Sequence, residues 1–284
     1  MRGWLDDRRG YMKPVQIGEV MRAGALGYVA KTGKGSKLSV GDLVYGGLGW
    51  REWGVYKEKE MRKIVVPKGV DPLDFLGPLG MTGMTAYFGL FDVGKIKAGD
   101  TLLVSGAAGA TGSVVCQLGK IAGAKVIALA GTPEKCEWLE REVGVDKAVN
   151  YKSPNFRQEF KDAVGYIDVY FDNVGGEILD MALLRLKKNA RIVLCDSRPY
   201  GITGYLNLIS QTATMQGFLI FDYAERFPEA IQTLSNWLKE GRIKRKFHVV
   251  EGLDKAPEAL PLLFTGGNTG KLVVKVGDYQ RAKL

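Results

Sequence analysis

Hydrophobic and polar residues follow two different patterns along this chain. From residue 101 onward, short runs that are almost continuously apolar alternate with longer segments whose apolar positions recur at helical spacing. Strands covered on both faces are apolar at nearly every position, because neither face meets water. The pattern therefore predicts a doubly wound α/β domain with a parallel sheet. Strands are expected at 101–106, 125–130, 146–151, 166–176 and 190–195, and helices at 111–122, 133–144, 155–164 and 177–186.

The chain before about residue 78 has a different pattern. Short β-forming segments are separated there by glycine, and no long helical stretch interrupts them. This is typical of an antiparallel β domain, so two domains are expected. A strand-like run at 271–276 is expected to return to the first of them. The β segments are GEVMRAG (18–24), GYVAKTG (27–33), DLVYGG (42–47) and EWGVYK (52–57).

Composition adds limits rather than a function. With 46% hydrophobic and 25% charged residues the chain is an ordinary globular protein. It has no apolar run of about 20 residues and no signal-peptide pattern, so we expect a cytoplasmic protein without a membrane partner. The net charge of +9 is scattered and not interleaved with aromatic residues, so no nucleic-acid partner is expected. Three widely spaced cysteines fit a reducing compartment.

Three glycines, Gly106, Gly109 and Gly112, lie between the first predicted strand and helix of the α/β domain. At this place in a doubly wound sheet, the turn and the helix N-terminus bind a pyrophosphate, and glycine lets the backbone approach it closely. The spacing differs from the usual G-x-G-x-x-G, and three glycines can also mark a tight turn alone. Their placement favours a dinucleotide site over that alternative.

The end of the next strand predicts which dinucleotide binds. An NAD site has an acidic residue about 20 residues after the glycines, whereas this chain has Ala130 and Gly131 there. Lys135 follows in the next turn, and Tyr151 follows the third strand. A lysine without the acid suits a 2′-phosphate, so NADP(H) is the expected cofactor. The alternative for Lys135 is a solvated lysine on a helix.

Few residues are available for other chemistry. His248 is the only histidine, and no cysteine pair has ligand spacing, so no metal site is expected. A Tyr-x-x-x-Lys pair of the kind used by short-chain reductases is also missing. What remains is hydride transfer to an activated, conjugated substrate, which needs a well-placed hydride and a polarised carbonyl.

Several motifs together resemble one known family, over nearly the whole chain. The resemblance is to the zinc-independent medium-chain reductases, and within them to the NADP-dependent alkenal double-bond reductases and prostaglandin reductases. It implies a Rossmann-type domain at 78–242 and a GroES-like substrate domain at 1–77 completed by 243–284. The motifs are GMTGMTAYFGL (80–90), AAGATGS (107–113), AGTPEKCEWL (130–139), VNYK (149–152), YIDVYFDNVGGEILD (166–180), ARIVLC (190–195), MQGFLIFDY (215–223) and GGNTGKLVVKV (266–276).

The resemblance also implies which residues bind the cofactor. Plain alternatives are core packing, a helix cap and turn formation, and the joint pattern favours the cofactor assignment. The nicotinamide end is assigned to Met81, Thr85, Asn173, Cys195, Phe218 and Ile220. The pyrophosphate is assigned to Gly109, Ala110 and Gly112, the 2′-phosphate to Lys135 and Tyr151, and a returning loop to Asn268 and Gly270.

Two departures from the family concern the activity. The opening segment is similar to one that lies inside the first domain of these reductases, so the GroES-like domain is expected to be truncated and incomplete. After Cys195 the chain runs directly to Pro199, where the family has a further stretch with a tyrosine beside the nicotinamide. No residue is a secure catalytic acid, and Tyr200 and Tyr205 are weak candidates.

The function implied by the resemblance is NADPH-dependent reduction of the C=C bond of α,β-unsaturated aldehydes or ketones, with activity impaired by the missing segments. Two alternatives are a quinone reductase of the same architecture and a truncated NADP-binding protein with little or no turnover. A homodimer is expected, because the family commonly pairs its dinucleotide domains and the apolar run 217–221 suits a strand near the sheet edge.

Overall fold

The computed structural model describes residues 5, 12–195 and 201–277. The chain forms two compact units. Unit 1 comprises residues 1–76, 249–265 and 273–284, and unit 2 comprises residues 77–248 and 266–272. No helix in the described ranges is long and apolar enough to span a bilayer.

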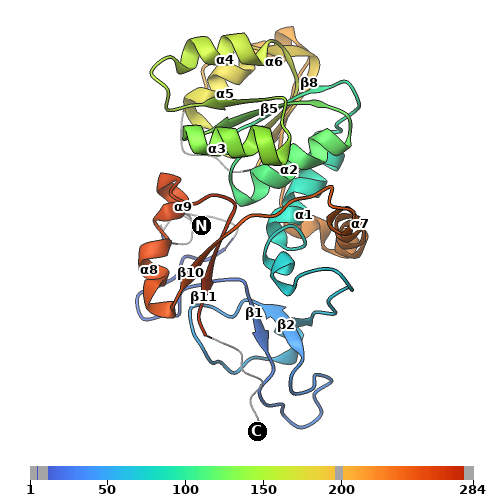
Figure 1. Cartoon of the computed structure of the whole chain (residues 1–284), viewed down its shortest axis with the longest axis vertical. Coiled ribbons are helices and arrows are strands. Elements are labelled where there is room, and N and C mark those ends of the chain that lie inside the picture. Colours follow the sequence, from blue (N-terminus) through green and yellow to red (C-terminus); the bar gives the residue numbers. More distant parts are fainter. Residues whose placement is uncertain (1–4, 6–11, 196–200, 278–284) are drawn as a thin grey trace. The chain divides into compact units, whose positions relative to one another are not determined.

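The described part of unit 2 is built on a six-stranded sheet with the order β6-β5-β4-β7-β8-β9. All neighbouring strands are parallel, which confirms the predicted doubly wound α/β fold. Figure 1 shows α2 and α3 on one face of the sheet and α4 and α5 on the other. The strands are β4 (Thr101–Val104), β5 (Lys125–Ala130), β6 (Lys147–Asn150), β7 (Ile167–Asp172), β8 (Leu186–Leu194) and β9 (Thr214–Gly217).

The helices begin and end where the sequence supplies caps and breakers. Thr132 caps α3 by accepting a hydrogen bond from the Lys135 N–H, and Pro133 occupies the first turn. The segment ends at Gly144, whose left-handed φ of 81° suits glycine. The α-helices of unit 2 are α1 (Met81–Phe88), α2 (Ala110–Ile121), α3 (Pro133–Trp138), α4 (Phe156–Val164), α5 (Gly176–Leu183), α6 (Leu206–Ser210) and α7 (Phe227–Lys239). Shorter helical turns of this unit are η4 (Gly89–Val93), η5 (Leu139–Val143) and η6 (Ile220–Arg226).

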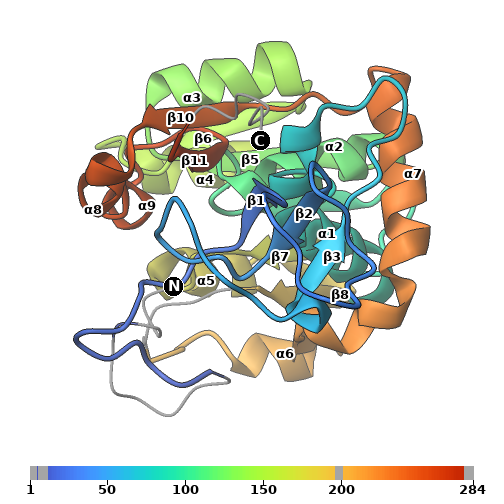
Figure 2. The same ribbon diagram turned by 90° about the horizontal axis from the view of Figure 1, so that it is seen from below.

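Apolar side chains between the sheet and its helices form the core of unit 2. Leu103, Ile127 and Tyr170 are completely buried in one cluster on the sheet. Outside the sheet, α7 runs beside α1 (Figure 2). The Phe88 and Phe227 rings stack there with their centroids 6.2 Å apart.

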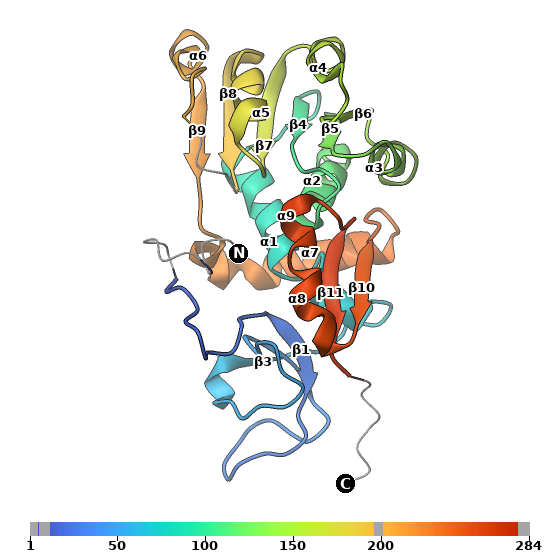
Figure 3. The same cartoon turned by 90° about the vertical axis from the view of Figure 1, so that its left-hand side faces the viewer.

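One segment differs from its prediction. The apolar run 217–221 is not a strand: β9 ends at Gly217, and the turn η6 begins at Ile220. The Phe218 side chain lies instead against Gly89, where a Cβ would be 2.8 Å from both the Phe218 and the Phe171 rings. The Phe218 ring also contacts Tyr223, with centroids 6.2 Å apart. The strand at this edge of the sheet is therefore the preceding segment, β9 (Figure 3).

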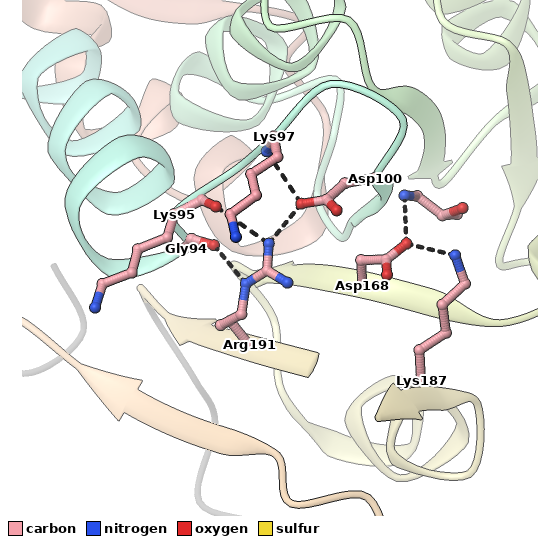
Figure 4. Close-up of polar contacts among 8 residues, drawn as sticks. Gly94, Lys95, Lys97, Asp100, Asp168, Lys187 and Arg191 are labelled. Atoms are coloured by element: carbon pink, nitrogen blue, oxygen red, sulfur yellow. Dashed lines mark hydrogen bonds and ion pairs between the residues drawn. The ribbon is translucent and has the colours of Figure 1, made fainter. Parts of the chain in front are cut away.

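Polar contacts join the amino ends of the sheet strands (Figure 4). Asp168 accepts hydrogen bonds from the Thr101 N–H at 2.8 Å and from the Lys187 ammonium at 2.6 Å. The Arg191 guanidinium donates to the Gly94 carbonyl at 2.9 Å and pairs with Asp100. Side chains from β7 and β8 thus fix the loop that leads into β4.

Unit 1 contains an antiparallel sheet of order β1-β2-β3 in its described residues. The antiparallel region is confirmed, but segments 18–24 and 52–57 are not strands. Strands β10 and β11 pair with each other, and the Lys271 N–H donates to the Lys246 carbonyl at 2.9 Å. The remaining elements are β1 (Ala25–Tyr28), β2 (Leu43–Gly46), β3 (Met61–Lys63), β10 (Phe247–Glu251), β11 (Lys271–Lys275), α8 (Ala256–Ala259), α9 (Leu262–Thr265), η2 (Glu58–Glu60), η3 (Pro72–Leu76) and η7 (Leu253–Lys255).

Candidate functional site: the carboxyl edge of the parallel sheet

The site lies where the strand order reverses. Strands β4 and β7 are neighbours, and the chain leaves them toward opposite sides of the sheet. In such sheets, ligands bind in the crevice at the carboxyl ends of these strands. Here the glycine turn that follows β4 occupies this position. Gly106 has a left-handed φ of 57°, and its carbonyl accepts the Gly109 N–H at 2.9 Å.

The glycine turn leaves the start of α2 open to a ligand. A Cβ on Gly112 would collide with the Gly106 carbonyl oxygen and lie 2.8 Å from Ala107 Cα, so only glycine fits there. The N-cap residue, Gly109, offers no side-chain hydrogen bond to the first turn. Uncapped N–H groups at a helix start attract anions. Gly109, Ala110 and Gly112 therefore fit the predicted pyrophosphate site.

A buried carboxylate ties the two strand ends together. Asp172, at the end of β7, is completely buried. Its Oδ1 accepts hydrogen bonds from Ser105 Oγ at 2.8 Å, Tyr170 OH at 2.7 Å and the Gly175 N–H at 2.9 Å. Burial and the Asp172 carboxylate raise the pKa of Tyr170 well above its ordinary value, so this phenol remains a donor.

The same network places Asn173 beside the glycine turn. Its N–H donates to Ser105 Oγ at 2.9 Å, and its Nδ2 donates to the Ser105 carbonyl at 2.8 Å. A Cβ on Gly106 would lie 3.3 Å from the Asn173 Cβ. The sequence motifs did not single out Ser105 or Asp172, and only their burial and contacts reveal these residues.

The end of β5 carries positive charge and no acid. Lys135 is half-buried, and its Nζ donates to the Gly266 carbonyl at 2.7 Å. Burial lowers the pKa of Lys135, and the positive charge of Lys152 lowers it further. Two ammonium groups that repel each other form a good site for an anion. Sequence reasoning missed Lys152, although it directly follows Tyr151.

Tyr151 also lies at this corner. A Cβ on Gly131 would lie 2.6 Å from the Tyr151 hydroxyl, so the glycine after β5 makes room for the phenol. An acidic side chain in place of Gly131 would meet the same obstruction. The residues at this corner therefore fit a phosphate on the ribose better than a free ribose hydroxyl pair.

The returning loop, residues 266–270, crosses from this corner to the glycine turn. The Gly270 N–H donates to the Ala108 carbonyl at 2.8 Å, and Gly270 forms a bridge with Gly109. A Cβ on Gly270 would collide with the Lys246 carbonyl group, so this close approach requires glycine. Asn268 Nδ2 donates to the Gly270 carbonyl at 2.9 Å.

The remaining predicted residues lie after β8, after β9 and on α1. The Cys195 N–H donates to the Asp172 carbonyl at 2.9 Å, which puts Cys195 at the same strand ends. Phe218 lies against Gly89, as does Phe171, the residue directly before Asp172, and Ile220 begins η6. Met81 and Thr85 lie on α1, where the Thr85 hydroxyl donates to the Met81 carbonyl at 2.7 Å.

Of the two tyrosines considered as proton donors, the structure describes only Tyr205. Tyr205 is 54% exposed and directly precedes α6, which leads into the amino end of β9, away from the glycine turn (Figure 3). Tyr200 lies outside the described residues. Within the described ranges, no group of three or more His, Cys, Asp or Glu side chains is arranged to hold a metal ion.

Comparison with known proteins gives consistent matches. A family model described as zinc-binding dehydrogenase matches residues 110–236, and one described as the N-terminal domain of oxidoreductase matches residues 1–64. The chain is 37% identical to the NADP⁺-dependent 2-alkenal reductase of Nicotiana tabacum, covering 84% of this chain and 73% of that protein. It is 34% identical to the NADPH-dependent curcumin reductase of Escherichia coli, covering 98% and 84%.

A solved structure is similar to this chain over nearly its whole length. The crystal structure of CurA from Vibrio vulnificus in complex with NADPH has a TM-score of 0.91 and 36% sequence identity. The match covers 98% of this chain and 86% of that chain.

The crowding at Gly112 predicts a binding defect. Gly112→Ala should force the glycine turn to move, and NADPH should bind at least about tenfold more weakly, a loss of about 1.4 kcal/mol. Isothermal titration calorimetry measures this affinity. Gly33→Ala in unit 1 is the matched control, because a Cβ there meets no atom within 4 Å. Unchanged affinity in Gly112→Ala would contradict the assignment of this turn.

Proposed function

We propose that this chain, which belongs to the medium-chain dehydrogenase/reductase family and is an NADP-dependent oxidoreductase, reduces the carbon–carbon double bond of α,β-unsaturated aldehydes and ketones. The cofactor is NADP(H). The observation that carries the substrate class is the 37% identity to a 2-alkenal reductase over 84% of the chain. The site adds support, because its described residues offer phosphate-binding groups and no metal cluster.

Unit 2 supplies the groups that would hold the cofactor. The open N–H groups at the start of α2 would bind the pyrophosphate, and Lys135, Lys152 and Tyr151 would bind the 2′-phosphate. Asn173, Cys195 and Phe218 would line the nicotinamide end with Met81, Thr85 and Ile220. Asn268 and Gly270 would close on the cofactor from the returning loop. We assign the substrate to the domain proposed at residues 1–77 and 243–284, and the cofactor to residues 78–242.

The main contribution of the protein to this reaction is to position the nicotinamide relative to the substrate. When bound, the nicotinamide supplies the hydride. Asp172 and Ser105 fix the glycine turn and Asn173 at the strand ends, so that the residues lining the site keep their positions. A small misplacement of about 1 Å costs roughly a hundredfold in rate. We assign no protein residue as the proton donor, and protonation from water completes the reaction.

A second candidate is reduction of quinones by the same hydride. A quinone is also a conjugated acceptor and needs neither a metal nor an acid–base pair. We favour the enone because of the 2-alkenal reductase match, since a quinone oxidoreductase from Pseudomonas syringae is only 22% identical and supports the fold alone. We also propose that no zinc takes part.

Turnover with matched substrates tests the function. An enone should cause steady NADPH oxidation, and the product should keep its carbonyl while losing its C=C bond, as product analysis would show. The corresponding saturated ketone is the control and should not react. Prior treatment with a chelator should leave the rate unchanged. Faster turnover of a quinone would favour the second candidate, and binding without any turnover would favour the non-catalytic alternative.

Cofactor preference tests the basic corner. NADPH should bind at least about tenfold tighter than NADH, a difference of about 1.4 kcal/mol, because an ammonium–phosphate contact is charge-assisted. Lys135→Ala should remove most of the preference and leave NADH affinity nearly unchanged, and Lys152→Ala should remove a smaller part. Lys161→Ala, on the exposed face of α4, is the control. Equal affinity of the unaltered protein for both cofactors would refute the assignment.

We further propose a cytoplasmic homodimer. The three cysteines are free thiols, which suits a reducing compartment. The edge of the sheet at β9 is flanked by exposed apolar side chains, including Ile209 at 76% exposure and Leu206 at 61%. Exposed apolar groups beside an unpaired strand are typical of an interface.

Light scattering tests the dimer. The chain should have twice its monomer mass, and Ile209→Asp should shift it toward monomer by placing a charge at the β9 edge. Val65→Asp is the matched control, because Val65 is 78% exposed and lies in unit 1. A monomeric unaltered chain at micromolar concentration would exclude the proposed dimer.

A further inference from the structure

Both ends of the returning loop are anchored to parts of the cofactor site. At one end, the Lys135 ammonium donates to the Gly266 carbonyl at 2.7 Å. At the other end, the Gly270 N–H donates to the Ala108 carbonyl at 2.8 Å. The loop therefore joins the basic corner after β5 to the glycine turn after β4.

Lys135 has capacity for a second partner. An ammonium group has three N–H donors, and the Gly266 carbonyl uses one of them. A phosphate oxygen can accept another without breaking the first hydrogen bond. Among the described residues, the Lys152 side chain makes no hydrogen bond or ion pair, so it adds charge to the corner without holding the loop.

We propose that Lys135 is a positioning residue that connects the 2′-phosphate of the cofactor to the returning loop, so that the phosphate holds residues 266–270 on the glycine turn. This inference rests on the NADP(H) assignment of the proposed function and is independent of the enone chemistry. Besides contacting the phosphate, Lys135 thereby helps to hold Asn268 and Gly270 in place.

Electrostatics explains why the phosphate strengthens the anchor. Without an anion, partial burial and the charge of Lys152 both disfavour the ammonium form of Lys135. A dianionic phosphate between the lysines offsets both effects, so that the Lys135 ammonium can bind the phosphate and the Gly266 carbonyl together. By thermodynamic linkage, a loop that is held in place favours phosphate binding to the same extent.

Gly270 reports on the state of the loop. It is buried, and a Cβ on it would lie 2.7 Å from the Lys246 carbonyl carbon, so it has little freedom to shift while docked. Its N–H exchanges with solvent only when its bond to Ala108 opens. NADH occupies the glycine turn but has no 2′-phosphate, so it should hold the loop less well even at saturation.

Hydrogen–deuterium exchange of a peptide containing Gly270 tests the proposal directly. Adenosine 2′,5′-bisphosphate and 5′-AMP are compared first, because they differ in the 2′-phosphate and both lack the nicotinamide. At saturation, the bisphosphate should slow exchange of the Gly270 amide at least about fivefold more than 5′-AMP does. NADPH should exceed NADH in the same way. Equal protection within both pairs in the unaltered chain would overturn the proposal.

Two variants separate anchoring from charge. In Lys152→Met, the phosphate-bearing ligands should bind more weakly but, once saturating, protect Gly270 as before. In Lys135→Met, the difference between ligands with and without the phosphate should disappear, while exchange of the β5 amides stays unchanged and shows an intact fold. A difference that survives in Lys135→Met would also overturn the proposal. Failure of the enone function would appear only in turnover and would leave these exchange data unaffected.

Discussion

The buried carboxylate of Asp172 is the interaction on which the site depends. It lies at the end of β7 and holds Ser105 at the end of β4, across the point where the strand order reverses. The Ser105 hydroxyl in turn accepts the Asn173 N–H, so one network fixes the glycine turn and the neighbouring loop together. A buried donor left without its acceptor costs about 1–3 kcal/mol. Because several donors converge on Asp172, loss of this carboxylate would release both loops at once.

The two ends of the sheet use polar groups differently. At the amino ends, Arg191 pairs with Asp100 and Asp168 pairs with Lys187, so these charges are neutralised within the protein. At the carboxyl ends, the backbone N–H groups at the start of α2 have no side-chain cap. Lys135 and Lys152 there carry positive charges that repel each other. Such N–H donors and positive charges can bind an anionic ligand.

The sequence allowed most of unit 2 to be predicted, because continuous apolar runs leave little choice but buried parallel strands. The sequence singled out Lys135 because it follows a strand end that lacks the acidic residue of an NAD site. It did not single out Lys152, since a lysine after a strand is usually solvated. The run 217–221 was misassigned as a strand. The sequence of a short apolar segment does not distinguish a strand that pairs in a sheet from a segment whose aromatic ring packs on a neighbour, as Phe218 does. Segments 18–24 and 52–57 show the same ambiguity in unit 1.

A 2′-phosphate takes no part in hydride transfer, and its binding energy aids the reaction only if it is transmitted to groups near the nicotinamide. Direct contacts with Lys135 and Lys152 alone would raise affinity equally in the ground and transition states. The Gly266 carbonyl links Lys135 to the loop that carries Gly270, and Gly270 contacts the Ala108 carbonyl. The proposed route therefore leads from the 2′-phosphate to the glycine turn, which Asp172 and Ser105 connect to Asn173. An enzyme that relies on placement rather than on a protein acid gains most from such a route. On the proposed function, discrimination for the phosphate would then be part of the catalytic geometry as well as of cofactor affinity.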